Sequence, residues 1–249
     1  MKAFGLSEIG PVRHTNEDRF VSAEDLHLYV VADGMGGHAA GEVAARLAVE
    51  SIESFVRRSS QSAGAAWPYD IDPALSHEAN RLKTAVILAN RRINDAAGQN
   101  HDYLGMGTTV VCALVSGGRL VVAHVGDSRL YLSNDQELVQ LTEDDSWTAA
   151  LVGSGNGGAA PAATRHVLTN VLGARPDTFI HVLERELAGD ETLLLCSDGL
   201  HGSVPHDTLR SLLLSHDDLP ALAEALITTA LEHGSRDNIT ALIVRCSGE

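Results

Sequence analysis

Three apolar, strand-like runs of this chain end in an aspartate beside a small residue. They are YVVAD at Asp33, VAHVGD at Asp127 and LLLCSD at Asp198, and a fourth aspartate, Asp237, comes just before the apolar run 239–245. A single aspartate at a strand end is usually a turn former that caps its own backbone. Four of them constrain the fold further, because neighbouring strands bring their ends to one rim, where unpaired carboxylates repel each other. All-carboxylate sites favour hard cations, so the pattern predicts a Mg²⁺ or Mn²⁺ site.

The segment after Gly107 is rich in β-branched residues and is interrupted by Gly117-Gly118, Gly126-Asp127 and Asn134-Asp135. This texture is typical of strands joined by hairpins, so we expect a largely antiparallel sheet. Further strands are predicted at 26–32, 192–196 and 239–245, and helices at 38–58, 75–97, 206–215 and 219–233. Strands in runs with helices in pairs favour an α+β fold of layers and argue against a doubly wound sheet.

The charge balance excludes two classes of partner. The chain has 249 residues with 18 Lys+Arg against 33 Asp+Glu, a formal net charge of −15. Binding to nucleic acid or to an anionic membrane needs a basic stripe, and none is present.

The three cysteines are scattered without a metal-binding spacing, and no apolar run is long enough to span a membrane. We expect one domain over residues 1–249, located in the cytoplasm.

A dinucleotide-binding site is the first alternative to a metal site. The pattern Gly34-x-Gly36-x-x-Ala39 follows a predicted strand and precedes a predicted helix. Asp33 would then stand beside the pyrophosphate as an uncompensated negative charge. Glu53, the acidic residue about twenty positions later, falls inside a predicted helix and does not end a second strand. The dinucleotide interpretation is therefore disfavoured, and the chain shows neither a Walker A motif nor a G-x-S-x-G motif.

Six ordered segments make a more specific pattern. They are RHTNED at 13–18, DGMGGH at 33–38 with AGE at 40–42, GMGTT at 105–109, VGDSR at 125–129, CSDGL at 196–200 and SRDN at 235–238. Together they resemble the motifs of the metal-dependent Ser/Thr protein phosphatases (PPM family, protein phosphatase type 2C) in their bacterial form. The resemblance runs from about residue 5 to 245 and implies a four-layer α-β-β-α sandwich, in which two antiparallel sheets pack together between helices.

The resemblance also implies a metal centre at one end of the sandwich. By motif position, Asp33 bridges two metals, the Gly34 carbonyl binds one of them, and Asp198 and Asp237 bind the other. Asp127 matches the residue that, with Asp198, holds a third metal in bacterial members. Glu17 and Asp18 are expected nearby, with Glu17 acting mainly through metal-bound water.

The chemistry expected of such a centre is hydrolysis without a phosphoenzyme. Two divalent ions share a water, lower its pKa and align it for in-line attack on phosphorus. Arg13 suits bidentate capture of a phosphate monoester, although a solvated surface arginine is the alternative. His38 could protonate the departing alkoxide, or could merely cap the helix that follows it. The predicted catalytic residues are Arg13, His38 and Asp33.

Two features depart from the family pattern. The sequence TEDDS at 142–146 places Asp145 where the family commonly has histidine. The segment that usually forms a helical flap, about 144–169, is Gly/Ala-rich over 153–163. We expect that flap to be mobile, which leaves its part in substrate recognition open.

The favoured function is therefore an active Mn²⁺- or Mg²⁺-dependent phosphatase. It would hydrolyse phosphoserine and phosphothreonine in proteins and reverse a cognate eukaryotic-like Ser/Thr kinase. One alternative is a catalytically silent sensor or scaffold of the same fold that binds phosphoproteins, which would normally have lost Asp33, Asp198 or Asp237. Another is a phosphatase of small molecules. Partners are expected to be phosphorylated proteins, with no nucleic acid and no membrane.

Overall fold

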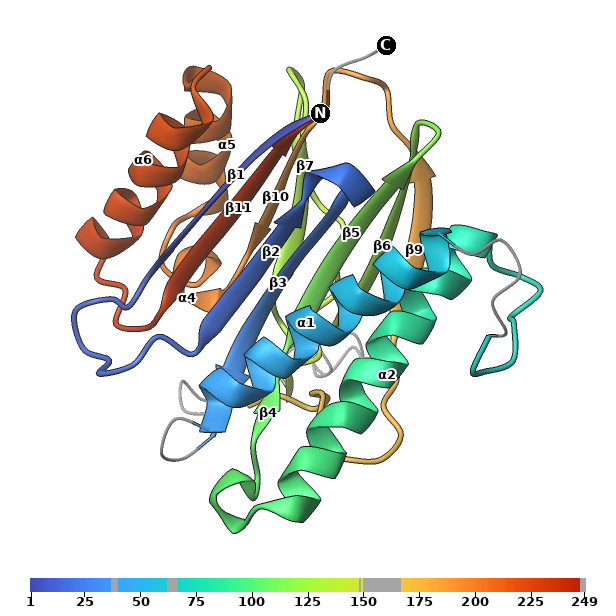
Figure 1. Cartoon of the computed structure of the whole chain (residues 1–249). Coiled ribbons are helices and arrows are strands. Elements are labelled where there is room, and N and C mark those ends of the chain that lie inside the picture. Colours follow the sequence, from blue (N-terminus) through green and yellow to red (C-terminus); the bar gives the residue numbers. More distant parts are fainter. Residues whose placement is uncertain (37–39, 62–66, 148, 150–166, 247–249) are drawn as a thin grey trace.

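The computed structural model describes residues 1–36, 40–61, 67–147, 149 and 167–246. Two antiparallel sheets pack face to face, with helices on both outer faces (Figure 1). The first sheet consists, in spatial order, of β1 (Lys2–Glu8), β11 (Ile239–Arg245), β10 (Thr192–Cys196), β7 (Arg129–Ser133) and β8 (Leu138–Gln140). The second consists of β2 (Asp18–Ala23), β3 (Leu28–Met35), β5 (Val110–Ser116), β6 (Arg119–Val125) and β9 (His181–Glu186), with β4 (Gly107–Thr108) paired to β3.

The helices fall into two groups. Those over the second sheet are α1 (Ala40–Gln61) and α2 (His77–Gln99), and those over the first sheet are α4 (Asp198–His201), α5 (His206–Ser215) and α6 (Leu219–Glu232). Two short 3₁₀ turns complete the described elements, η1 (Glu24–Leu26) and η2 (His101–Tyr103). Ser76 caps α2 by accepting from the Ala79 amide, and Asp218 caps α6 by accepting from the Ala221 amide.

Three hydrophobic layers hold these elements together, one between each helix group and its sheet and one between the sheets. Strand β5 shows how one segment serves two layers. Its residues Val111 and Ala113 point into the layer between the sheets, whereas Val110, Cys112 and Leu114 face the layer under α1 and α2. Because both faces of β5 are buried, its sequence is a continuous apolar run without polar alternation. The predicted α+β, four-layer sandwich is confirmed.

Most predicted elements lie within a few residues of the observed ones. The strand predicted at 26–32 extends as β3 through Asp33 to Met35, and the helix predicted at 75–97 is observed as His77–Gln99. The first helix is described from Ala40 onward, so its expected start at His38 lies outside the described residues. The expected mobility of 153–163 concerns residues that also lie outside them.

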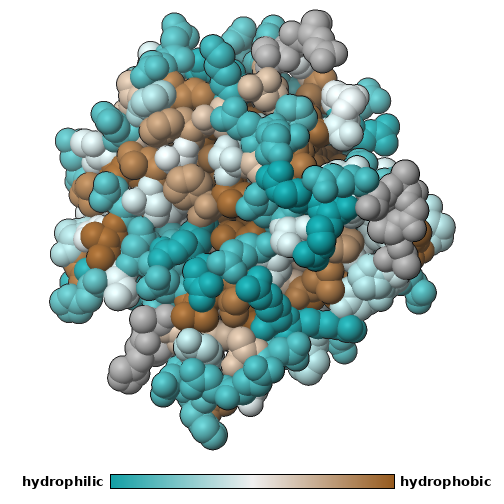
Figure 2. All heavy atoms as spheres, viewed as in Figure 1, coloured by the Kyte–Doolittle hydropathy of each residue, from teal (hydrophilic) through white to brown (hydrophobic). Residues whose placement is uncertain are grey.

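The surface is predominantly polar on the face that carries α1 and α2. Figure 2 shows hydrophilic side chains over most of this face, with hydrophobic ones visible in small groups between them. Among the described helices, none is both long and apolar enough to cross a membrane.

Candidate active site

The strand ends next to the predicted carboxylates lie at one end of the sandwich, the lower end in Figure 1. Asp33 lies near the end of β3, and Asp18, at the start of β2, is its direct partner in the strand register. Asp198 opens α4 two residues after β10 ends, and Asp237 lies two residues before β11, the neighbour of β10. Asp127 lies in the turn between β6 and β7. Antiparallel pairing therefore brings together residues that are up to 219 positions apart, from 18 to 237.

The electrostatics confirm that these side chains form one cluster. Burial raises the pKa of Asp33 well above its ordinary value, and the negative charges of Asp18, Asp198, Asp127 and Asp237 raise it further. Carboxylates this close cannot all stay ionised without a compensating cation.

Two further members of the cluster show the same effect. Burial raises the pKa of Asp127 to about 7, with the charge of Asp198 adding to the effect. Burial likewise raises the pKa of Asp18 to about 6, although hydrogen bonds from Thr240 and Ser197 oppose the shift. The cluster is thus strained electrostatically in the absence of a cation.

Asp18 is the most enclosed carboxylate of the cluster. Its Oδ2 accepts hydrogen bonds from Ser197 Oγ at 2.7 Å and from Thr240 Oγ1 at 2.6 Å. Its Oδ1 is buried and has no hydrogen-bond partner among the described residues. A buried carboxylate oxygen without a donor is costly, which is the situation that a nearby cation or its bound water relieves.

The glycines after Asp33 allow a close approach between β3 and the start of α1. A Cβ on Gly34 would lie 2.1 Å from the carbonyl oxygen of Gly41, and a Cβ on Gly41 would lie 2.8 Å from the carboxyl carbon of Glu17. The Gly34 amide donates to the Glu17 carbonyl at 3.2 Å. These glycines therefore allow β3, the start of α1 and the Glu17 carboxylate to pack closely. This packing accounts for the glycines without a dinucleotide-binding role.

Arg13 reaches the cluster from the loop between β1 and β2. Its Nη2 donates to Asp237 Oδ2 at 2.6 Å, and half of its side-chain surface remains exposed. The hydrogen bond to Asp237 raises the pKa of Arg13, with smaller contributions from the charges of Glu17 and Asp33. The guanidinium thus lies beside the carboxylate cluster with part of its surface open to solvent.

Asn238 has a structural role at this site that the sequence did not reveal. Its side-chain oxygen accepts from the Glu17 amide at 2.9 Å, and its Nδ2 donates to the carbonyls of Ile9 and Thr15. One amide side chain thereby fastens the loop that carries Arg13 and Glu17 to the strand end that carries Asp237. Its only sequence signal was its place next to Asp237 in the SRDN motif.

The turn that carries Asp127 is held from two sides. Arg129 binds Asp144 through Nε and Nη2, at 2.9 and 2.7 Å. Asp145 accepts from the Gly126 amide through Oδ2 at 3.0 Å, and its Oδ1 lies 2.9 Å from Nε2 of His181. The aspartate that departs from the family pattern is therefore a well-partnered residue behind the Asp127 turn.

The donor set fits hard divalent cations, since it consists of carboxylates and a backbone carbonyl, and Asp18 Oδ1 is a buried oxygen without a donor. Within the described ranges, however, no three Asp, Glu, His or Cys side chains are arranged so that they could hold a metal ion as they stand. The structure brings together eight of the nine predicted site residues, and the ninth, His38, lies outside the described residues.

Comparison with known protein families supplies the deciding observation, because the model of the family "Protein phosphatase 2C" matches residues 13–238. This chain belongs to the protein phosphatase 2C family. The serine/threonine phosphatase stp of Listeria monocytogenes is 34% identical over 98% of this chain and 95% of its own length. The crystal structure of the Mycobacterium tuberculosis serine/threonine phosphatase PstP is 32% identical, with a TM-score of 0.85 over 99% of this chain and 98% of that one.

A further solved relative within the protein phosphatase 2C family bears on the cofactor. The catalytic domain of PstP in complex with two manganese ions is 32% identical to this chain, with a TM-score of 0.81 over 99% of this chain and 98% of that one. The predicted family, fold and enzyme class, a metal-dependent serine/threonine phosphatase of bacterial type, are thereby confirmed. The silent scaffold and the small-molecule phosphatase are not favoured by these relatives. The individual site residues and the single domain over 1–249 stay predictions.

Proposed function

We propose that this chain hydrolyses phosphoserine and phosphothreonine in proteins with two divalent cations, Mn²⁺ or Mg²⁺, held at the Asp33 cluster. Asp33, the Gly34 carbonyl, Asp198 and Asp237 would hold these cations. The observation that supports this assignment is the convergence of five carboxylates at strand ends, four of which raise the pKa of the fifth, Asp33, through their charges. Asp127 is the candidate ligand of a third cation, and Glu17 and Asp18 support the centre.

When bound, the cations would lower the pKa of the attacking water and stabilise the charge that develops on the phosphate oxygens. The rest of the catalysis falls to side chains of this chain. Arg13, half exposed and oriented by Asp237, would bind the phosphate through its remaining N–H groups and place phosphorus against the cluster. Asp18, held by Ser197 and Thr240, would fix the position of the Asp33 carboxylate. His38 is the candidate donor of a proton to the leaving alkoxide.

The substrates are phosphorylated proteins, and a Ser/Thr kinase must generate them. We place the enzyme with its cognate kinase in the reducing cytoplasm. In support, Cys112, Cys196 and Cys246 are all free and buried, and burial raises the pKa of each thiol. Buried thiols of raised pKa are poor nucleophiles, which also argues against a cysteine-based phosphatase mechanism.

A chelation experiment with a matched variant tests the proposal. Wild type and Asp198→Asn are assayed on p-nitrophenyl phosphate and on a phosphothreonine peptide, with Mn²⁺ and then with excess EDTA. We expect EDTA to abolish wild-type hydrolysis, and Asp198→Asn to lower kcat/KM by at least about 100-fold, because one carboxylate ligand is lost.

Asp135→Asn is the control, since Asp135 lies exposed in the turn after β7, and it should retain wild-type activity. Hydrolysis that survives chelation would contradict the metal-dependent mechanism. Absence of hydrolysis in folded, Mn²⁺-loaded wild type would favour the scaffold hypothesis instead.

A further inference from the structure

Two cavities adjoin each other at the start of β9, on either side of Phe179. Their volumes are about 440 and 420 Å³, and both are lined by Phe179 and His181. The Phe179 ring stands edge-on against the His181 ring, at 4.7 Å between centroids, and 70% of Phe179 is exposed. The Phe179 ring therefore stands exposed in the lining of both hollows, where a bound ligand would contact it.

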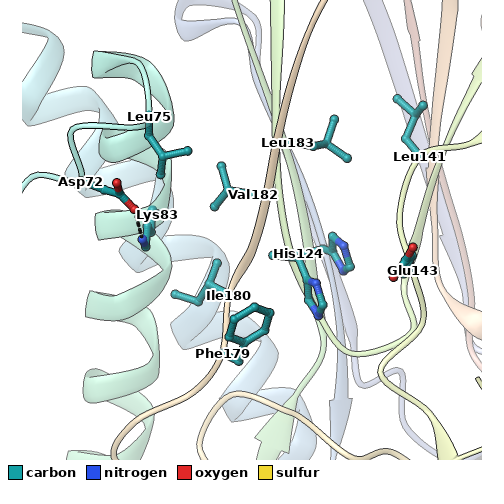
Figure 3. A pocket seen from close by; sticks show the side chains of 11 residues that line it. Asp72, Leu75, Lys83, His124, Leu141, Glu143, Phe179, Ile180, Val182 and Leu183 are labelled. Atoms are coloured by element: carbon teal, nitrogen blue, oxygen red, sulfur yellow. Dashed lines mark hydrogen bonds and ion pairs between the residues drawn. The ribbon is translucent and has the colours of Figure 1, made fainter. Parts of the chain in front are cut away.

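The first cavity extends over both faces of β9. Figure 3 shows Ile180 and Val182 on the side of α2, and Leu183 with Leu141 on the other side. His124 also lines it and stacks on His181 at 4.5 Å between ring centroids. His124 is only 3% exposed, and its Nδ1 has no hydrogen-bond partner in the part of the chain that the structure describes. His124 therefore forms part of the buried wall of this cavity.

The second cavity is connected to the candidate active site by hydrogen bonds. Asp145 lines it and binds His181 on one side and the Gly126 amide on the other. Gly126 directly precedes Asp127. Asn170 completes the connection, since its Nδ2 donates both to Asp145 and to the carbonyl of Phe179, each at 2.8 Å. The lining of the second cavity is therefore joined to the turn that carries Asp127 through Asp145 and the Gly126 amide.

Strand β9 is an edge strand, with no neighbour on its outer side among the described strands. The Leu187 amide donates to the Gly118 carbonyl, and these two residues continue the β6–β9 register. Every second residue of β9 therefore forms its backbone hydrogen bonds with β6. It follows that the backbone groups of Val182 and Glu184 point outward. An extended peptide can pair with such an edge while its side chains enter the adjoining hollows.

The charges of the lining restrict the occupant. The first cavity carries Asp72 and Glu143 against one base, Lys83, which binds Asp72 at 3.2 Å. In the second, Asp145 and Asp177 stand against Arg175. Each hollow thus has a formal charge of −1, on a molecule whose net charge is −15. An acidic peptide would be repelled, whereas a neutral or basic one with large apolar side chains would be accepted.

We propose that the two hollows around Phe179 bind the segment of a substrate protein that flanks its phosphorylated residue, in extended form, through large apolar side chains. The proposal rests on the proposed function, because the phosphate of the same peptide would occupy the carboxylate cluster. Phe179 is then a specificity residue that contacts the substrate, and the hollows select against acidic flanking residues.

Three phosphothreonine peptides of equal length test this selection. The residues around the phosphothreonine are alanine in the first, leucine and phenylalanine in the second (the apolar peptide), and glutamate in the third (the acidic peptide). For the Mn²⁺-loaded full chain we expect the apolar peptide to exceed the alanine peptide about tenfold in kcat/KM, mainly through KM, and the acidic peptide to be the poorest. Phe179→Ser should reduce the ratio of kcat/KM for the apolar peptide to kcat/KM for the alanine peptide to about one, and Phe179→Leu should retain much of the wild-type ratio. Leu214→Ser is the matched control, since Leu214 is 45% exposed and belongs to α5.

p-Nitrophenyl phosphate, which has no flanking residues, separates this proposal from the proposed function. Phe179→Ser should hydrolyse it within twofold of wild type. An unchanged peptide ratio in Phe179→Ser, or an equal loss on both substrates, would overturn the docking site and leave the phosphatase function intact. If the chain hydrolysed neither substrate, fluorescence anisotropy would still test whether the hollows bind the peptide. The labelled apolar peptide without phosphate should bind wild type at least fivefold more tightly than Phe179→Ser, and equal binding would refute the proposal.

Discussion

At the scale of single residues, the site is defined by carboxylates whose surroundings oppose their charge. Asp127 is 8% exposed, and burial raises its pKa to about 7 from an ordinary value of 3.8. Asp18 is 1% exposed, one of its oxygens has no hydrogen-bond partner among the residues that the structure describes, and burial raises its pKa to about 6. Both groups hold their protons more tightly in the folded protein than in the unfolded chain.

The stability of the metal-free protein should therefore depend on pH in a predictable direction. The contribution of Asp127 is fully present below about pH 4 and is lost as the pH rises towards 7. We expect the free energy of unfolding of the EDTA-treated protein to fall over this range. Asp127→Asn should reduce the slope of the free energy of unfolding against pH. It should also stabilise the metal-free protein at pH 7.5 by on the order of 2 kcal/mol.

Urea denaturation at pH 4.5, 6 and 7.5 measures this effect. The exposed Asp135→Asn serves as control and should leave the slope as in wild type. A slope that Asp127→Asn does not change would mean that Asp127 is already compensated in the folded state.

At the scale of the elements, the site depends on how closely α1 approaches β3. Gly41, in the first turn of α1, has the backbone of Gly34 and Met35 and the carboxyl carbon of Glu17 within 2.8 Å of where a Cβ would be. Backbone atoms cannot move aside individually, so any side chain at this position must displace the whole helix start.

We predict opposite outcomes for two glycine-to-alanine changes in neighbouring helices. Gly41→Ala should destabilise the protein by about 1–3 kcal/mol and lower kcat, because it displaces Glu17 and β3 beside Asp33. Gly98→Ala, in α2 with nothing within 4 Å of its Cβ position, should be neutral or stabilise by up to about 1 kcal/mol. Thermal unfolding and the p-nitrophenyl phosphate assay measure both effects. Equal stability of the two variants would contradict the close contact.

At the scale of the whole molecule, part of the net charge of −15 has a definite location. Asp18, Asp33, Asp127, Asp198 and Asp237 place five carboxylates at one end of the sandwich, where two divalent cations would bring +4. Ligands that bind only the folded state stabilise it by mass action, and each occupied site adds about 2.7 kcal/mol at a concentration 100 times its Kd.

With two sites occupied, saturating Mn²⁺ should accordingly raise the melting temperature of the wild-type protein by roughly 10–20 °C. Asp237→Asn should lose most of this increase while melting close to the wild type in EDTA. Differential scanning calorimetry with and without Mn²⁺ measures both. An unchanged melting temperature in the wild type would show that the carboxylate cluster does not bind the metal.

Much of the fold could be predicted from the sequence because its signals are local. The apolar runs of β10 and β11 are bounded by turn residues, so their limits emerged directly from the pattern. The helix spacing located α5 and α6 in the same way. The roles of Asn238 and Asp145 could not be predicted, since each binds backbone groups of segments that are distant in sequence, up to 229 residues for Asn238 and Ile9.

The sequence by itself determined the chemistry of this protein, an all-oxygen cluster of aspartates at strand ends, because residue type and local turn context suffice to specify ligand hardness and charge. Only the tertiary structure decided what surrounds that chemistry. Antiparallel packing buries Asp18 with an orphaned oxygen, joins Arg13 to Asp237, and sets the hollows around Phe179 beside the Asp127 turn. Burial, pKa and neighbouring cavities depend on segments that are remote in the chain, and only folding brings such segments together.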